Sequence, residues 1–435
     1  MFLLLFIGYK GGIATYKHVF AHLVIFNFIL VFGALLNFDY LYPKAAISQI
    51  IMWNEPIILF LILVNLPFSL QDIKTFNKLL FFLIVFEFIV GIIQVPIYLK
   101  TGESESIIGT FHGNAEQYAD FLMIGIFYLF GKSKTEPARK ILYNVIIPAM
   151  LALILLIENK ASWIGIGLSV MYLLHRMGRL EIYVAHKMKY IFIFSLLLLF
   201  ALFVIFRSAS TLHKYAAIEQ AWQSGNFFNL GKMKAYRDTF MSYNDKPYMA
   251  LVGSGPGTFY SRASNQFFEL TEDMFIIPLT SLLGKKEEYR ASDSMGGVIK
   301  KAEMESFFKT FFFESKIYLT GSGTVDDPFF SFVALLGETG LAGTFIYLGI
   351  YIIIFKKLSF YFDQWRDDSM IFPLIASTLG FLVYIMVISI YNNWLETGRL
   401  TTILWSMIAM VLKYGDLTAT NELSGSYKTS NAYAS

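Results

Sequence analysis

The chain has 435 residues, of which 56% are hydrophobic and 15% are charged, whereas soluble domains are usually roughly 45–50% apolar and about 25% charged. This composition excludes an ordinary soluble enzyme and predicts an all-α polytopic membrane protein, because most of the length must face lipid or a helix packed in lipid. The formal net charge of +3 is too close to balance to indicate nucleic acid as a partner. The absence of cysteine excludes disulfides, thiolate metal sites and cysteine nucleophiles.

A membrane-spanning helix needs about 20 mostly apolar residues. The apolar segment 1–8 is too short to cross and has no basic region before it, so we interpret it as half a helix and not as a signal peptide. With ten longer candidates, we expect about ten or eleven transmembrane helices. The ten predicted spans are residues 18–37, 46–65, 77–99, 115–130, 140–157, 161–174, 190–206, 329–355, 371–391 and 398–413.

Alternation of these spans across a bilayer divides the Lys and Arg residues of the short loops unequally. Sixteen fall on one side and four on the other. Because cytoplasmic loops carry the excess of Lys and Arg, the richer side is predicted to be cytoplasmic, with both termini inside.

This orientation divides the chain into four regions. Residues 1–206 hold about seven spans and the half helix, and residues 329–413 hold three spans. Between them, residues 207–328 form one large extracytoplasmic loop, rich in Phe, Tyr and Leu, that we expect to fold as a helical cap; 217–222 and 232–243 have helical spacing. Residues 414–435 are rich in Ser, Thr, Asn and Gly and are predicted to be a disordered cytoplasmic tail.

A glycine-rich segment inside the loop, 253–257 (GSGPG), could hold a phosphate with its backbone amides, which makes Gly253 and Gly255 candidate binding residues. Its spacing does not match a P-loop, so a simple tight turn is the favoured interpretation. The single His-x-x-x-His pattern, His18 and His22, has no acidic residue beside it that could be a further ligand, and no acidic cluster has metal-ligand spacing. We therefore predict neither a metal nor a cofactor.

Polar residues recur where outer loops meet helices, and ionisable groups at membrane depth usually face a cavity or a partner. Glu338 is the clearest example, because it lies about ten residues inside an apolar span. For Lys160, Glu396 and Arg399, the alternative is that each side chain extends to the membrane interface. The other members of this group are His112, Asn114, Glu116, Asn159, Asp326 and Asp327.

A cationic cluster occupies residues 231–238 (GKMKAYRD) in the loop. On a helix Lys234 and Arg237 are neighbours, and Lys232 lies on an adjacent part of the surface. These residues could simply form a solvated face. Beside a membrane they could instead bind an anionic group such as a pyrophosphate, for which the Arg guanidinium is well shaped.

In order, these segments resemble the O-antigen ligase and polymerase-like superfamily of membrane glycosyltransferases. The similar segments are 109–122 (GTFHGNAEQYADFL), 158–165 (ENKASWIG) with Lys160 at a family Arg position, 232–236 (KMKAY) followed by 251–259 (LVGSGPGTF), and 326–343 (DDPFFSFVALLGETGLAG). Ligases of the family carry a His-Asn pair at the loop exit, where this chain has Asp326 and Asp327. The resemblance therefore favours the Wzy-type polymerase branch.

The resemblance implies a GT-C-like enzyme in the bacterial inner membrane, with its loop in the periplasm. It would polymerise oligosaccharide repeat units carried on undecaprenyl pyrophosphate into surface polysaccharide, either O-antigen or exopolysaccharide. Its partners would be that glycolipid, the lipid bilayer, and a chain-length regulator and a flippase of the same pathway. Cations stabilise a leaving pyrophosphate and a carboxylate or His can assist the acceptor hydroxyl, so the expected binding residues are Lys160, Lys232, Arg237, Arg399, Asn114, Gly253 and Gly255, and the expected catalytic residues are Asp326, Asp327, Glu338 and His112.

Other functions stay open at this point. An O-antigen ligase would transfer the polysaccharide to an acceptor such as lipid A core. A transporter of lipid-linked sugar would also have many spans and buried charge, but it should show internal repeats and broken helices in matching halves, which this sequence does not. A non-catalytic scaffold of an envelope assembly complex would not need the cationic cluster.

Overall fold

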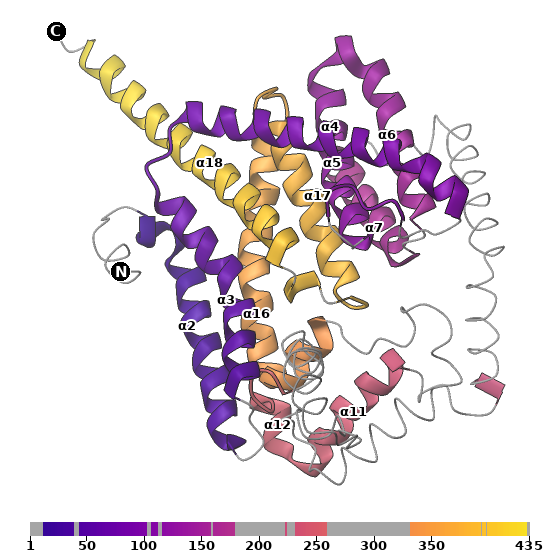
Figure 1. Cartoon of the computed structure of the whole chain (residues 1–435). Coiled ribbons are helices and arrows are strands. Elements are labelled where there is room, and N and C mark those ends of the chain that lie inside the picture. Colours follow the sequence, from indigo (N-terminus) through magenta and orange to yellow (C-terminus); the bar gives the residue numbers. More distant parts are fainter. Residues whose placement is uncertain are drawn as a thin grey trace, which may run out of the picture.

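The computed structural model describes residues 12–38, 43–101, 106–111, 115–157, 160–178, 222–223, 231–258, 331–392, 394–396 and 398–432. Within these ranges every regular element is a helix and there is no strand. In chain order the elements are α2 (Gly12–Leu36), α3 (Pro43–Asn65), α4 (Leu70–Thr101), α5 (Ala115–Thr135), η3 (Pro137–Arg139), α6 (Lys140–Leu156), α7 (Lys160–Arg176), α11 (Gly231–Asp245), α12 (Pro247–Val252), α16 (Ser331–Gln364), α17 (Phe372–Ile388), η9 (Trp394–Glu396) and α18 (Gly398–Ala432). Figure 1 shows α2, α3 and α16 side by side, with α11 and α12 at the lower ends of α2 and α16.

Within the described ranges, six helices are long and apolar enough to cross a membrane, namely Tyr16–Leu36, Ala46–Asn65, Leu70–Thr101, Pro137–Leu156, Ser331–Gln364 and Gly398–Ala419. The prediction of an all-helical, multi-pass membrane protein is therefore confirmed. Three further predicted spans, at 115–130, 161–174 and 371–391, form helices α5, α7 and α17. The predicted span at 190–206 and the half helix at 1–8 lie outside the described residues.

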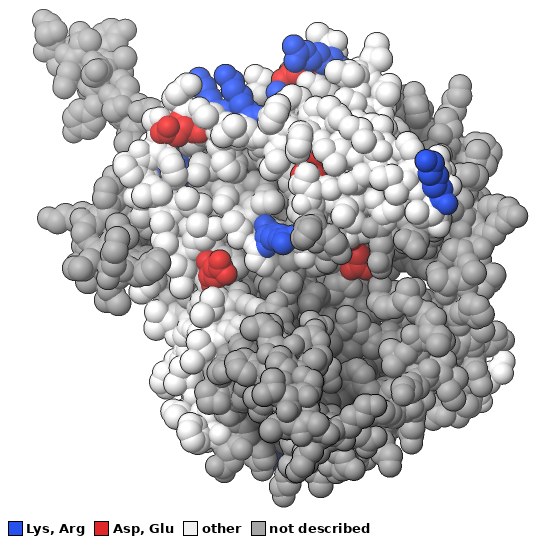
Figure 2. All heavy atoms as spheres, viewed as in Figure 1, with Lys and Arg blue, Asp and Glu red and all other residues white. Residues whose placement is uncertain are grey.

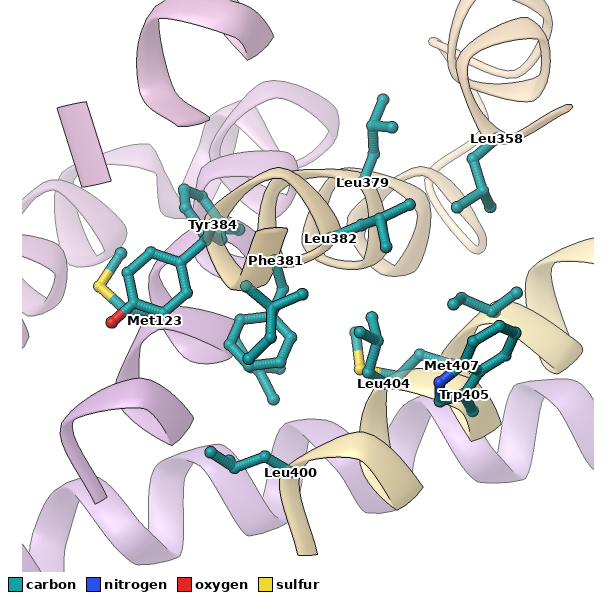
Figure 3. Close-up of a cluster of buried hydrophobic side chains, with 14 of the residues drawn as sticks. Met123, Leu358, Leu379, Phe381, Leu382, Tyr384, Leu400, Leu404, Trp405 and Met407 are labelled. Atoms are coloured by element: carbon teal, nitrogen blue, oxygen red, sulfur yellow. The ribbon is translucent and has the colours of Figure 1, made fainter. Parts of the chain in front are cut away.

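Helices α5 and α17 form the centre of the bundle. Most residues of both helices are buried and none is exposed, as expected for helices that contact protein on every side. By contrast, α4 leaves Leu79 and Phe82 exposed, which is the pattern of a helix that faces lipid. The two central helices approach closely at Gly131, where an added Cβ would lie 2.7 Å from the Cα of Pro373. Figure 3 shows side chains of α5, α17 and α18 meeting in this core.

One end of the bundle gathers the ends of several helices and their charged side chains. The Nζ of Lys134, near the end of α5, lies 3.4 Å from the Oδ1 of Asp367 in the α16–α17 turn. Arg366 donates to the carbonyl oxygen of Arg176 at 2.6 Å, and Lys413 donates to that of Val64 at 3.1 Å. These four cations all belong to the side that the Lys and Arg count predicts to be cytoplasmic. In the view of Figure 2, blue side chains lie mainly along the upper edge, above a surface that is mostly uncharged.

The opposite end carries the described part of the large loop. The predicted helix at 232–243 is confirmed by α11, which covers Gly231–Asp245. Of the predicted helical stretch 217–222, only residue 222 is described. The short helix α12 follows α11 directly and packs against α16 and α2.

The C-terminal segment differs from the prediction of a disordered tail, because α18 continues as a helix to Ala432. Its residue Asp416 accepts a hydrogen bond from the Tyr16 hydroxyl at 2.9 Å and lies 3.4 Å from the Nζ of Lys357. These contacts come from α2 and α16, so composition alone does not reveal them. Once α18 is nucleated by its apolar half, each further residue adds a hydrogen bond at a low entropic cost.

Candidate active site

The glycine-rich turn at residues 253–257 packs directly on the first part of α16. The amides of Ser254 and Gly255 donate to the carbonyl oxygens of Gly337 and Glu338, at 2.9 and 3.0 Å. In return, α16 is kinked at Gly340, which has φ 63° and ψ −169°. Two segments that the sequence analysis singled out separately, GSGPG and GETGLAG, therefore form one contact, which we call the motif junction.

The motif junction leaves no room for side chains on its glycines. A Cβ on Gly340 would lie 2.5 Å from the carbonyl carbon of Leu251, and a Cβ on Gly253 would overlap the carbonyl of Glu338. On the α2 side, a Cβ on Gly33 would lie 2.8 Å from the carbonyl oxygen of Val252. The junction thus depends on backbones that approach each other closely, which explains why glycine is required there.

The amides of this turn are all used within the protein. Gly253 donates to the carbonyl of Met249 at 2.9 Å, and Gly257 donates to the Oε1 of Glu338 at 2.9 Å, while Ser254 and Gly255 bind α16 as described. Pro256 has no amide hydrogen. The geometry favours the tight-turn interpretation, because Gly253 and Gly255 have no amide left with which to hold a phosphate.

Glu338 is fully buried at the motif junction. Besides the Gly257 amide, its carboxylate accepts a hydrogen bond from the indole of Trp53, in the middle of α3, at 3.2 Å. The carboxylate thus joins α3, α16 and the glycine-rich turn. An acceptor held by donors from two other elements favours a positioning role for Glu338 over the predicted role of general base.

We expect Glu338→Gln to destabilise the folded protein by about 1–3 kcal/mol, because the amide nitrogen must face one of two N–H donors and leave it unpaired. Thermal unfolding in detergent would measure the loss. Glu55→Gln, which removes an exposed carboxylate from α3, is the matched control and should unfold near the wild-type temperature. Equal unfolding temperatures for the two variants would contradict the role given to Glu338.

Helix α11 lies across the same end of the bundle. The hydroxyl of Tyr236 donates to the carbonyl oxygen of Ile390 at 3.3 Å, and that of Tyr243 donates to the carbonyl oxygen of Leu336 at 2.8 Å. Burial raises the pKa of Tyr243 to about 12. Burial, with a smaller contribution from Tyr391, raises the pKa of Tyr236 to about 12 as well. Both phenols are therefore neutral hydrogen-bond donors at physiological pH.

The start of α16 also meets the connection between α17 and α18. The amide of Ser331 donates to the carbonyl oxygen of Asn392 at 3.1 Å, and the amide of Leu395 donates to the Oγ of Ser331 at 3.0 Å. Since Tyr236 binds Ile390 in this connection, α11, the start of α16 and the segment that leads to Arg399 are held together.

The predicted cations are described to different degrees. Arg237 is half-buried on α11, and Arg399 is exposed as the second residue of α18. The backbones of Lys160 and Lys232 begin α7 and α11, but their side chains lie outside the described part of the structure. The predicted residues His112, Asn114, Asp326 and Asp327 also lie outside it. Among the described residues, no group of three or more His, Cys, Asp or Glu side chains could hold a metal ion.

Sequence reasoning missed a second buried polar cluster, formed by Asp120 on α5, Ser162 on α7 and Tyr384 on α17. The Tyr384 hydroxyl donates to the Oδ1 of Asp120 and lies 2.6 Å from the Oγ of Ser162. Asp120 is fully buried, and its Oδ2 has no hydrogen-bond partner. The signal was present, because Asp120 and Ser162 lie in two of the family-like segments and a carboxylate inside an apolar span is costly.

A third buried acid, Glu87, holds the loop before α5. Its carboxylate accepts hydrogen bonds from the amide and the hydroxyl of Thr110. About two turns further along α4, the Oε1 of Gln94 accepts from the amides of Ile108 and Gly109 at 2.9 and 2.8 Å. These contacts satisfy the non-helical backbone of a loop that packs against a membrane-spanning helix, where water cannot do so. These contacts give Gly109 and Thr110, which lie in one of the family-like segments, a structural role in holding the loop.

The geometry described so far can be compared with known proteins. No protein-family model matches this chain, and no curated protein does. The resemblance to the O-antigen ligase and polymerase-like superfamily therefore depends on the quoted motifs and on their arrangement.

Proposed function

We propose that the protein is a membrane glycosyltransferase that polymerises oligosaccharide repeat units carried on undecaprenyl pyrophosphate. The observation that carries the proposal is the motif junction. Two segments that resemble family motifs, far apart in the chain, bind each other through Gly257 and Glu338 at the end of the bundle where α11 lies. A shared position for separate motifs is what a common site requires.

The proposed reaction needs cations for the leaving pyrophosphate and a base for the acceptor hydroxyl, and the expected site residues include both kinds. The acceptor hydroxyl attacks the anomeric carbon of the donor glycan, the bond to the pyrophosphate oxygen breaks, and the hydroxyl proton goes to a base. Cations stabilise the departing pyrophosphate, and we assign that role to Lys160, Lys232, Arg237 and Arg399. Asp326, Asp327 and His112 are the proposed bases, while Glu338 positions the glycine-rich turn.

The proposal takes this end as the extracytoplasmic one. The Lys and Arg count of the short loops supports that orientation, and the end that gathers Lys134, Arg176 and Arg366 is then cytoplasmic. A lipid pyrophosphate is a reasonable activated donor on the outer face, because nucleotide sugars are not present there. In this orientation α11 and α12 would lie in the periplasm of a bacterium.

The direct test uses the purified full chain in nanodiscs with an undecaprenyl-pyrophosphate-linked oligosaccharide, and products are separated by length. We expect a ladder of longer lipid-linked glycans together with released undecaprenyl pyrophosphate. Transfer to a lipid A core acceptor without a ladder would identify a ligase. Consumption of no donor in either format would contradict glycosyl transfer and favour transport or scaffolding.

Variants of α11 test the proposed cation site. We expect Lys232→Ala and Arg237→Ala each to shorten the polymer sharply, because each removes a cation that we assign to the leaving pyrophosphate. Lys234→Ala removes the same charge from the same helix and should have a mild effect, so it is the matched control. Wild-type chain length in both Lys232→Ala and Arg237→Ala, with normal insertion, would eliminate the proposed pyrophosphate site on α11.

A further inference from the structure

Three cations converge at the bundle end opposite α11, where α5, α7 and α16 end. Lys134 lies in the last turn of α5, Arg176 is the last residue of α7, and Arg366 follows α16. We call these three residues the basic triad. Arg176 donates to the carbonyl oxygen of Ser359 at 2.9 Å, Arg366 to that of Arg176 at 2.6 Å, and Lys134 to that of Arg366 at 3.0 Å. The carbonyl groups at helix ends thus draw the three cations together.

The carboxylates in this region do not fully neutralise the basic triad. Asp363 is shared, because its two oxygens bind the two different guanidinium groups. The only other acid bound to the triad among the described residues, Asp367, is 96% exposed, and its Oδ1 lies 3.4 Å from the Nζ of Lys134. Within the described part of the chain, three cations therefore face two carboxylates.

The guanidinium groups also have unused hydrogen-bonding capacity. The side chains of Arg176 and Arg366 are 31% and 34% exposed, so an anion can reach them from outside. In each, one terminal nitrogen makes the described contacts; the Nε has no acceptor but is buried, so an anion from outside would bind at the terminal nitrogens. Each guanidinium carries five N–H donors in a planar fork that matches a phosphate.

An apolar surface leads up to the basic triad along α7. Ile164, Leu168 and Met171 are exposed and lie three or four residues apart, so they share one face of the helix. Arg176 lies in the last turn of the same helix, about 110° around the helix axis from this face. Beside it, the ring of Tyr172 packs against that of Phe355 on α16, with centroids 5.3 Å apart. A long apolar chain could therefore lie along α7 while a charged group attached to it reaches the triad.

We propose that the basic triad and this face of α7 bind one anionic phospholipid, with the phosphate at Arg176, Arg366 and Lys134 and an acyl chain along Ile164, Leu168 and Met171. Charge complementarity and the apolar approach together favour a phospholipid over a soluble anion. Basic pockets between transmembrane helices are known to select anionic head groups in this way. The inference does not depend on the proposed glycosyltransferase activity.

The test counts the phospholipids that stay with the purified full chain in native mass spectrometry after exchange into phosphatidylglycerol or phosphatidylcholine. We expect the wild type to retain several-fold more phosphatidylglycerol than phosphatidylcholine. In the double variant R176Q/R366Q, the ratio of retained phosphatidylglycerol to retained phosphatidylcholine should fall at least five-fold. The matched control, K140Q/K356Q, removes two exposed cations outside the triad and should keep it.

A single variant and a competition with inorganic phosphate test the same lipid site further. If R176Q/R366Q does not fold, K134Q alone tests the same site, and its phosphatidylglycerol retention should fall at least two-fold. Addition of inorganic phosphate should leave the retained lipid in place, because the acyl chain contributes to binding. Equal lipid preference in the triad variants and the control, or full displacement by inorganic phosphate, would overturn the proposal.

Discussion

Gly340→Ala should prevent the protein from folding normally, with a destabilisation of more than about 3 kcal/mol. The residue has φ 63° and ψ −169°, a region that essentially only glycine occupies, and forcing alanine into it costs about 1–3 kcal/mol. In addition, the new Cβ would lie 2.5 Å from the carbonyl carbon of Leu251. The backbones must then separate, which breaks the hydrogen bonds between the glycine-rich turn and α16. The yield of monodisperse protein and its thermal unfolding temperature measure this effect.

Substitutions at two other glycines distinguish the effect of backbone strain from the effect of the steric clash. Gly167→Ala adds a Cβ with nothing within 4 Å, inside α7, and should be neutral or slightly stabilising. Gly178 has φ 63° but is also in open space, so Gly178→Ala reports the backbone strain without the clash. We expect the loss of stability in Gly178→Ala to lie between the losses in Gly167→Ala and Gly340→Ala. A Gly340→Ala protein as stable as Gly167→Ala would show that the motif junction is not formed as described.

Tyr384→Phe should be the second most damaging change, because it removes a donor from a carboxylate that is already short of partners. Asp120 is fully buried and its Oδ2 has no hydrogen bond, so loss of the Tyr384 hydroxyl leaves Ser162 as the remaining donor to Oδ1, at 3.4 Å. Leaving a buried polar group unpaired costs about 1–3 kcal/mol. Thermal unfolding of the variant in detergent would measure the loss.

Asp120→Asn tests whether charge or geometry matters in this cluster. The amide oxygen can still accept from Tyr384, and the cost of a buried charge disappears, so we expect stability equal to or above that of the wild type. Ser169→Ala is the control, because the Oγ of Ser169 is buried without a partner and its removal should cost nothing. If Tyr384→Phe unfolds at the same temperature as Ser169→Ala, the cluster does not contribute to packing of α5, α7 and α17.

Much of the helical fold could be predicted from the sequence, because runs of about 20 apolar residues identify a span without any knowledge of its neighbours. The distinction between lipid-facing and central helices was less accessible. The window 115–130 is apolar, as are those of the outer helices, although its Gln117 and Asp120 indicate contact with protein. The helical continuation of α18 was not predicted; Asp416, near the start of the C-terminal segment, is bound by Tyr16 and Lys357, far away in the chain.

At the candidate site, single segments could be predicted from the sequence, but the contacts between distant segments could not. The tight turn at 253–257 and the unusual Glu338 could each be recognised locally. Their contact could not, because hydrophobic periodicity reports which face of a helix is buried and not which segment covers it. Likewise Trp53 gave no signal of its own, although its indole is one of the two donors to Glu338.

The hydrogen bond between Gly257 and Glu338 joins positions 81 residues apart and closes a loop that contains all the residues between them. The entropic cost of closing a ring rises only with the logarithm of its length, and doubling the length adds about 0.6 kcal/mol. A change in chain length within residues 259–325 should therefore cost far less stability than a change at either anchor. An added segment of this kind would leave the two anchors and the hydrogen bond between them unchanged.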